Sequence, residues 1–147
     1  MFSWGLNDHG QLGHGPSSQD KILRPRQVKL VRIRGKGNQL ETIKEDDIFI
    51  LDIAAGPEHA IMLADNGLVY TWGSGESGRL GHGNETKVSR PTQVWRMLQE
   101  SGTSGAAIGL VNVATHVACG EAHSLAMTME GFVYVWGCME GGRLGLT

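Results

Sequence analysis

A run of basic side chains is the part of this sequence best suited to binding a partner. Residues 21–36 contain seven Lys and Arg residues and no Asp or Glu, whereas the rest of the chain carries 6 basic and 15 acidic residues. In residues 28–34, apolar and basic side chains alternate, with one slip at Leu30 and Val31. This pattern predicts a β-strand with a bulge and one basic face. The candidate partner-binding residues are Lys29, Arg32, Arg34 and Lys36.

The basic strand is expected to form one side of a β-hairpin. The sequence GKGN at residues 35–38 is a turn signal, and an acidic segment comes after it. Because this hairpin is longer than a repeat needs, we expect it to project from the body of the fold. Two interpretations remain open: the hairpin is a solvated element whose cations pair with nearby carboxylates, or its basic face contacts an acidic partner. The carboxylates concerned are Glu41, Glu45, Asp46 and Asp47.

Histidine is a common metal ligand, but the six histidines of this chain form no metal-binding pattern. No two His, Cys or carboxylate residues have zinc-finger spacing. Four histidines occupy matched positions of an internal repeat, His14 with His82 and His59 with His123. The second pair comes directly after predicted turns, where the imidazole is expected to hydrogen-bond the backbone and hold the turn. We therefore predict no metal site.

The sequence contains no recognisable catalytic or cofactor site. Residues 73–78, GSGESG, match the GxGxxG dinucleotide pattern, but the segment RLGHGNETKVSRP after them does not predict the helix that a dinucleotide fold requires. No serine lies in a GxSxG motif. Cys119 and Cys138 form no CxxC pair and stand where another repeat has Ala or Ser, so both are expected to be small packing residues. We predict a non-enzymatic protein with no cofactor and no small-molecule substrate.

An internal repeat sets the elements that carry these residues. The blocks WGLNDHGQLGHG, WGSGESGRLGHG and WGCMEGGRLGLT align without gaps at residues 4–15, 72–83 and 136–147. Residues 52–59, DIAAGPEH, align with residues 116–123, HVACGEAH, and the segments RPRQV and RPTQV come after the first two blocks. The residues expected to be structural in this repeat are Trp4, Gly5, Trp72, Gly73, Trp136, Gly137, Gly56, His59, Gly120, His123, Gly67 and Gly131.

Short apolar segments separated by turns predict an all-β fold. In the second repeat, residues 53–55, 60–64 and 68–72 read as strands, with Asn66-Gly67 as a two-residue hairpin turn. The RPxQV segment adds a fourth strand, and antiparallel four-stranded repeats around an axis form the blades of a β-propeller. The Trp rings are expected to fill the space between blades. The glycine excess, 22 of 147 residues, is explained by the repeat, since glycine adopts the positive φ that tight turns require.

We predict a single partial, open propeller domain of about two blades over residues 1–147. Its repeat units span approximately residues 1–51 (incomplete), 52–115 and 116–147 (incomplete), with insertions at 31–47 and 99–110.

The WGxxxxG[QR]LG blocks, the Gly-x-x-His element and the RPxQV strand resemble the repeats of the regulator of chromosome condensation family. This resemblance covers most of the chain outside the insertions and implies a seven-bladed propeller, of which the chain holds about two and a third repeats. We therefore expect a fragment of a longer protein whose open ends leave apolar interblade faces without a neighbour. The last block departs from the pattern at Leu146, where the others have His14 and His82.

Propellers carry their binding residues in the loops at the two ends of the ring, and this predicts a protein-interaction or scaffold module. The resemblance implies an alternative, a guanine-nucleotide exchange factor for a Ran-type small GTPase that docks on chromatin. The implied protein partners are a small GTPase or histones, and the basic strand offers a weaker route to DNA phosphates.

The expected location is intracellular, in the nucleus or cytoplasm. The N-terminal sequence MFSWGLNDHG lacks the basic and apolar regions of a signal peptide. No apolar run approaches the roughly 20 residues that span a bilayer, so we expect no membrane partner.

Overall fold

The computed structural model describes residues 1–16, 18–34, 39–94 and 113–146, and of Arg34 the backbone alone. Lys36 and the predicted insertion at 99–110 lie outside the described residues. The described chain consists of β-strands and three short 3-10 turns, so the all-β prediction is confirmed. These turns are η2 (Glu45–Asp47), η3 (Glu76–Gly78) and η4 (Glu140–Gly142). No helix within the described ranges is long and apolar enough to cross a membrane.

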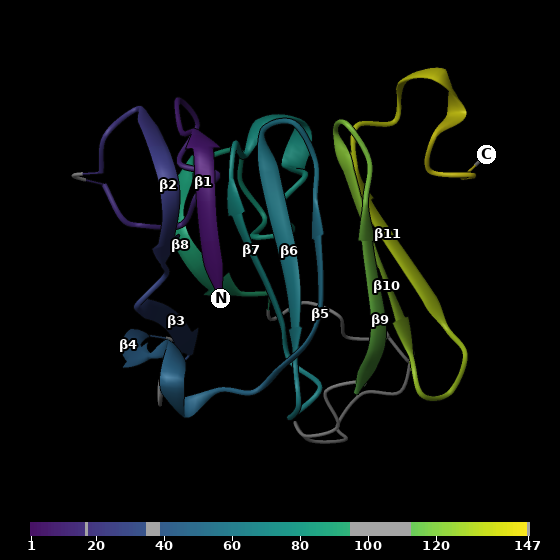
Figure 1. Cartoon of the computed structure of the whole chain (residues 1–147). Coiled ribbons are helices and arrows are strands. Elements are labelled where there is room, and N and C mark those ends of the chain that lie inside the picture. Colours follow the sequence, from purple (N-terminus) through teal and green to yellow (C-terminus); the bar gives the residue numbers. More distant parts are fainter. Residues whose placement is uncertain (17, 35–38, 95–112, 147) are drawn as a thin grey trace.

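The second repeat forms a complete four-stranded blade (Figure 1). Each strand is antiparallel to the next, in chain order from β5 to β8. The strands are β5 (Ile50–Ala55), β6 (His59–Ala64), β7 (Val69–Gly73) and β8 (Val88–Gln93). The predicted blade of four antiparallel strands is therefore confirmed, with boundaries close to those expected from the sequence.

Partial blades flank this complete blade. β1 (Phe2–Leu6) pairs antiparallel with β2 (Lys21–Gln27), and the two carry the Trp and RPxQV motifs of the third and fourth strands of a blade. On the other side, β9 (Ala114–Cys119), β10 (His123–Thr128) and β11 (Val133–Gly137) form a three-stranded antiparallel sheet. They correspond to the first three strands of a blade, and the whole is an open, partial propeller.

The basic hairpin forms, but it does not project. β3 (Leu30–Arg34) pairs antiparallel with β4 (Leu40–Lys44), as the sequence predicted. However, β3 also pairs in parallel with β8, through Arg32 and Thr92, which extends the sheet of the second blade to six strands. The prediction of a projecting hairpin was wrong because the edge of β8 has unpaired backbone groups that another strand satisfies. The expected bulge is also absent from β3: a break at residues 28–29 separates it from β2 instead.

The turn after β6 holds three residues rather than the predicted two. The amide of Ala64 donates to the carbonyl of Leu68 (3.0 Å), and the amide of Gly67 donates back to Ala64 (2.9 Å). Gly67 has φ +76°, so the third loop residue adopts the left-handed conformation of a three-residue hairpin. The turn after β10 repeats this arrangement, with Gly131 at φ +84°.

The core lies on both faces of β6, which is buried along its whole length. One cluster faces the hairpin and the first blade and contains Val31, Ile48, Ala60, Met62, Ala64, Tyr70 and Trp72. The other faces the third blade and contains Ile61, Leu63, Val69, Val94, Ala114 and Ala126. Because successive residues of a strand point to opposite faces, the continuous apolar run of β6 supplies both clusters.

The outward faces of the two partial blades are apolar and exposed. Phe2, Trp4 and Leu6 alternate along β1 and are 60%, 58% and 60% exposed. With Ile53 and Ala55 of β5, they line a cavity of about 430 Å³. Large apolar residues are also exposed at the other end, on β10, β11 and the turns beside them: Met127, Met129, Phe132, Val133 and Met139.

Candidate interaction surface

Of the basic residues singled out in the sequence, Lys29 lies on the link between β2 and β3, and Arg32 and the backbone of Arg34 lie on β3. Lys29 is exposed on the link, and Arg32 is half-buried in β3. Arg32 is directly opposite Thr42 on β4, whereas Glu41 is opposite Ile33. Since opposite residues of an antiparallel pair share a face, the cation and the carboxylate lie on different faces of the hairpin. The apolar face, with Val31, is packed on the core.

Two acidic residues near the hairpin bind other groups. The carboxylate of Glu45 pairs with the amino group of Met1, and that of Asp46 accepts a hydrogen bond from the Gln27 amide (3.2 Å). Within the described ranges, neither Lys29 nor Arg32 forms an ion pair. The predicted pairing of these two cations with the acidic segment after the hairpin turn is therefore not observed.

The Trp residues of the repeat occupy the blade junctions. Trp72 is 1% exposed, and its Nε1 donates to the carbonyl oxygen of Gln11 in the preceding blade (2.7 Å). Trp136 is half-buried and lies against Gly81, where a Cβ would sit 2.8 Å from the indole Nε1. Trp4 is exposed because no strand of the described chain covers that face of β1. A Trp ring of the repeat is thus covered, fully at Trp72 and in part at Trp136, where the preceding blade is present.

The repeat glycines hold two kinds of turn. Gly5, Gly73 and Gly137, which come directly after the Trp residues, have φ of +110°, +112° and +118°. At Gly73 a side chain would also collide with the backbone of Glu58 and His59. The turn before the second strand is closed by the amide of Gly56 donating to His59 (2.9 Å) and that of Gly120 donating to His123 (3.0 Å).

A hydroxyl residue and a histidine form a clip in each of the first two blocks. The Thr71 hydroxyl donates to the carbonyl of Leu80 (2.6 Å) and lies 3.1 Å from Nε2 of His82. Ser3 and His14 repeat this geometry, at 2.6 Å and 3.0 Å. Because the single hydroxyl proton goes to the carbonyl, the imidazole Nε2 must be the donor in each clip.

The third block has lost both partners of the clip. Val135 stands in the position of Thr71, and Leu146 stands in the position of His82. The departure at Leu146 is therefore one half of a paired change. Comparison of the residue before each Trp would have identified it from the sequence.

His59 reaches across to the third blade. Its Nε2 lies 3.0 Å from the hydroxyl of Ser124, which itself donates to the carbonyl of Arg79 (2.8 Å). Burial, with the nearby Arg79 charge, lowers the pKa of His59 to about 4, so the ring is neutral at neutral pH. The predicted hydrogen bond from the ring to the backbone of its own turn was wrong: Nδ1 of His59, like that of His123, is buried and has no hydrogen-bond partner among the described residues. The His59 ring contacts the next blade instead.

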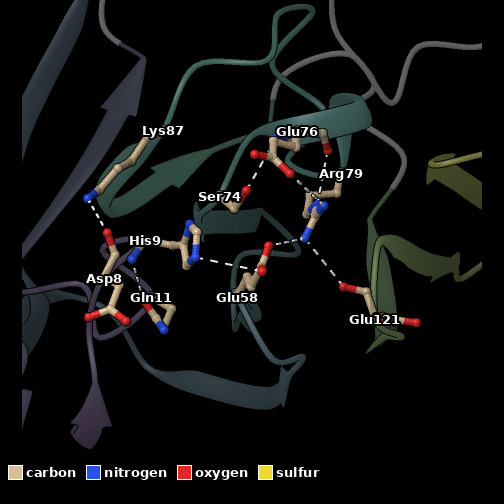
Figure 2. Close-up of polar contacts among 9 residues, drawn as sticks. All are labelled: Asp8, His9, Gln11, Glu58, Ser74, Glu76, Arg79, Lys87 and Glu121. Carbon is tan, nitrogen blue, oxygen red and sulfur yellow. Dashed lines mark hydrogen bonds and ion pairs between the residues drawn. The ribbon is translucent and has the colours of Figure 1, made fainter.

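A polar cluster that sequence reasoning missed joins the loops at one end of the blades (Figure 2). The guanidinium of Arg79 pairs with Glu58 (2.8 Å), contacts Glu76 (3.6 Å) and reaches the carbonyl of Glu121 on the third blade (3.5 Å). His9 of the first blade lies 3.6 Å from the other Glu58 oxygen. The Arg79 side chain is 8% exposed, so a paired, mostly buried cation ties the loops together. The available signal was the Gln or Arg that the repeat places before its Leu-Gly.

The histidines and cysteines show no reactive arrangement within the described residues. No three His, Cys, Asp or Glu side chains gather there as metal ligands. Cys119 and Cys138 are free, and burial raises the pKa of Cys119 to about 11, which keeps the thiol protonated. Cys119 packs against the core cluster between the second and third blades.

The repeat geometry can be compared with known proteins. The family model of the regulator of chromosome condensation (RCC1) repeat matches residues 1–63 and 66–127, and a second model of the same repeat matches residues 50–79. The chain belongs to the RCC1 repeat family. The family resemblance drawn from the Trp-Gly blocks is therefore confirmed.

RCC1-repeat proteins of very different description are similar to this chain. It is 35% identical over 147 residues to human E3 ubiquitin-protein ligase HERC2 and 34% identical over 147 residues to the ultraviolet-B receptor UVR8 of Arabidopsis thaliana. It is 36% identical over 146 residues to the RCC2 homolog of Xenopus laevis. Each alignment covers 99% of this chain but only 2%, 27% and 23% of the respective relative. The chain thus spans about a quarter or less of these proteins.

Solved RCC1-type structures share the fold. Yeast RCC1 (Prp20), in a complex with Kap60, superposes with a TM-score of 0.68 at 25% identity, over 99% of this chain and 30% of that one. Human WBSCR16 gives a TM-score of 0.66 at 24% identity, over 95% of this chain and 29% of that one. Another structure of Prp20p, from Saccharomyces cerevisiae, is described together with its binding properties to Gsp1p and histones.

Proposed function

We propose that this chain is a non-enzymatic protein-interaction module whose basic surface contacts an acidic partner protein. The basic surface is defined by Lys29 and Arg32, and Arg34 and Lys36 continue it along the sequence. The observation that carries the proposal is that Lys29 and Arg32 have no ion-pair partner within the described ranges, while Glu45 and Asp46 bind other groups. Unpaired surface cations of one sign attract and orient an acidic partner.

The relatives support a binding role rather than one particular chemistry. A ubiquitin ligase, an ultraviolet-B receptor and an RCC2 homolog share these repeats, so the repeat itself is compatible with several activities. The similarity to Prp20 favours one form of this proposal, in which the protein is nuclear or cytoplasmic and its partners are histones or a GTPase.

Charge reversal on the basic surface tests the proposal. Binding of nucleosomes, whose histones present an acidic patch, and of a Gsp1-type GTPase to the chain is measured by biolayer interferometry for wild type, for Lys29→Glu/Arg32→Glu, and for the control Lys21→Glu/Arg24→Glu. The control makes the same charge change on exposed residues of β2. We expect the first variant to lower the affinity for at least one probe about tenfold or more and the control to lower it much less. Equal losses in both variants would contradict a defined surface.

The alternative function is guanine-nucleotide exchange on a Ran-type small GTPase, supported by the similarity to Prp20. Release of bound GDP from the GTPase is measured with and without the full-length protein. Acceleration that Arg32→Glu/Arg34→Glu abolishes would favour exchange. Binding without acceleration would favour the interaction module, and salt-sensitive binding of DNA lost in the same variant would favour chromatin docking through nucleic acid.

A further inference from the structure

A small basic hollow lies between the first and second blades, where β2 faces β8. Its volume is about 190 Å³, and every ionisable residue that lines it is a base. The lining residues are Gly13, His14, Arg26, Gln27, Lys29, Leu30 and Arg90. No carboxylate is among them, so the hollow concentrates positive charge from two blades.

The second blade contributes the cation Arg90 to the hollow, and this side chain lies against the first blade. Arg90 is half-buried on β8, and its guanidinium lies beside Gly15, where a Cβ would sit only 2.7 Å from Nη2. The amide of Gly15 donates to the carbonyl of Ser89 (2.8 Å), which ties this loop to β8. The absence of a side chain at Gly15 therefore lets the guanidinium lie close to the loop that carries His14.

The first blade supplies the facing cations. Arg26 lies on β2, close enough to His14 that its charge, after the larger effect of burial, helps to lower the imidazole pKa. His14 is itself fixed by the contact of its Nε2 with Ser3 (3.0 Å). Lys29 is the exposed residue just beyond β2 on the link to β3.

The cations of this hollow are not neutralised by the residues that the structure describes. Within the described part of the chain, none of Arg26, Lys29 and Arg90 forms an ion pair. The nearby carboxylate of Asp46 binds the Gln27 amide instead. Like charges gathered around one hollow repel one another, and a bound anion would relieve this repulsion.

We propose that Arg26, Lys29 and Arg90 bind a phosphate monoester, presented as a phosphorylated serine or threonine side chain of a partner protein. A phosphate monoester carries close to two negative charges at neutral pH and accepts several hydrogen bonds, and arginine presents a planar fork that suits its oxygens. The cations lie on two sides of a hollow rather than along a track, which suits one compact anionic group better than a nucleic-acid backbone. The part of this proposal in which a partner protein supplies the phosphate rests on the proposed interaction function.

The repeat provides a matched set of variants. In the aligned RPxQV segments, Thr92 of the second repeat stands where the first repeat has Arg26. Arg26→Thr therefore introduces a residue that this strand position already holds in the next repeat. Arg24→Thr makes the same change on the same strand, at an exposed residue that does not line the hollow. Arg90→Lys keeps the charge but removes the guanidinium fork.

Binding of O-phosphoserine, of a phosphoserine peptide and of its unphosphorylated form is measured by calorimetry on the whole chain. We expect saturable binding of both phosphorylated probes, tighter for the peptide, and none of the unphosphorylated peptide. Arg26→Thr should weaken binding about tenfold or more, Arg90→Lys several-fold, and Arg24→Thr by less than about twofold, since a charge-assisted hydrogen bond to a bound anion contributes roughly 1.5–3 kcal/mol. Thermal unfolding of each variant checks that it is folded.

Three results would overturn the proposal. The first is that the wild-type chain does not bind phosphoserine. The second is that Arg26→Thr and Arg24→Thr lose affinity for the phosphorylated probes equally. The third is that the chain binds duplex DNA with an affinity that depends equally on Arg26 and Arg24. If free phosphoserine binds as tightly as the phosphopeptide, the claim that a partner protein supplies the phosphate is overturned. Because phosphoserine alone requires no partner, failure here leaves the interaction module standing, and that proposal fails only on the Lys29→Glu/Arg32→Glu comparison.

Discussion

The two blade junctions of this chain satisfy the same backbone carbonyl with different donors. Between the first and second blades, the indole of Trp72 donates to Gln11 (2.7 Å). Between the second and third blades, the equivalent carbonyl, that of Arg79, accepts a hydrogen bond from the Ser124 hydroxyl (2.8 Å). The indole N–H of Trp136 is buried there and has no hydrogen-bond partner among the described residues.

This difference depends on one substitution within the repeat. Ser124 occupies the position of Ala60, which has no hydroxyl to offer at the first junction. The hydroxyl also brings His59 of the second blade into contact with the third. The repeat thus determines which backbone group faces the next blade, while a single side chain decides how that group is satisfied and whether His59 contacts the next blade.

The largest effect should come from removing the Trp of the first junction. Trp72→Ala removes a ring that is 1% exposed together with its hydrogen bond, and we expect the free energy of unfolding to fall by about 3–5 kcal/mol. Trp136→Ala should cost clearly less because that ring is half-buried. Urea denaturation followed by circular dichroism measures both. Equal losses would show that the two junctions contribute alike.

Acid should weaken the second junction through His59. Its pKa is about 4 in the folded chain and about 6.5 when exposed, so both states are neutral above pH 6.5. As the pH falls from 6.5 to 4, the unfolded chain binds the proton first, and stability falls by up to about 3 kcal/mol. The measurement is the free energy of unfolding against pH.

The control for this prediction is His59→Gln, whose amide retains a donor but does not titrate. The chain has other histidines, so the effect of His59 is the difference between the wild-type and variant pH profiles. Parallel profiles over this range would exclude His59 as the acid-sensitive group of the junction.

A smaller and sharper comparison isolates the indole hydrogen bond. Trp72→Phe and Trp136→Phe remove the same part of the ring, but only the first breaks a hydrogen bond and leaves the Gln11 carbonyl without its donor. We expect Trp72→Phe to cost about 1 kcal/mol more than Trp136→Phe, the usual net contribution of one hydrogen bond. A larger loss for Trp136→Phe would indicate that its N–H does have a partner.

The smallest effect should appear in the hydroxyl–histidine clip. In a double-mutant cycle with Thr71→Val and His82→Leu, which reproduces the residue pair of the third block, we expect a coupling energy of about 0.5–1.5 kcal/mol. Denaturant unfolding of the four proteins measures it. Zero coupling would mean that the paired loss at Val135 and Leu146 does not reflect the clip.

The strands of the repeat could be predicted well because each depends on local pattern. The short apolar segments and the turn signal at Asn66-Gly67 placed β6 and β7 within a residue or so of their observed ends. The turn length was misjudged because the pairing of Ala64 with Leu68 depends on how the two strands register. The location of the hairpin was also wrong, since the edge of β8 that receives β3 lies about sixty residues further along the chain.

The candidate binding residues were only partly predictable. Lys29 and Arg32 stand out because they belong to one continuous basic run. Arg90 carries no such signal, since it belongs to the RPxQV strand of the second repeat and meets Arg26 only where two blades face each other. The pairing of Arg79 with Glu58 was missed for the same reason: a loop after one strand meets a turn between two others.

The family, the all-β class and the residues of each blade follow from the sequence, because the Trp-Gly blocks, turn glycines and proline-led strands act through short-range geometry. Which cations lie together, which carboxylates are already engaged, and why Trp72 is buried while Trp4 is exposed became clear from the folded chain alone. These outcomes depend on contacts between different blades. Repeats that look alike along the chain therefore differ in chemistry according to the neighbour each one meets.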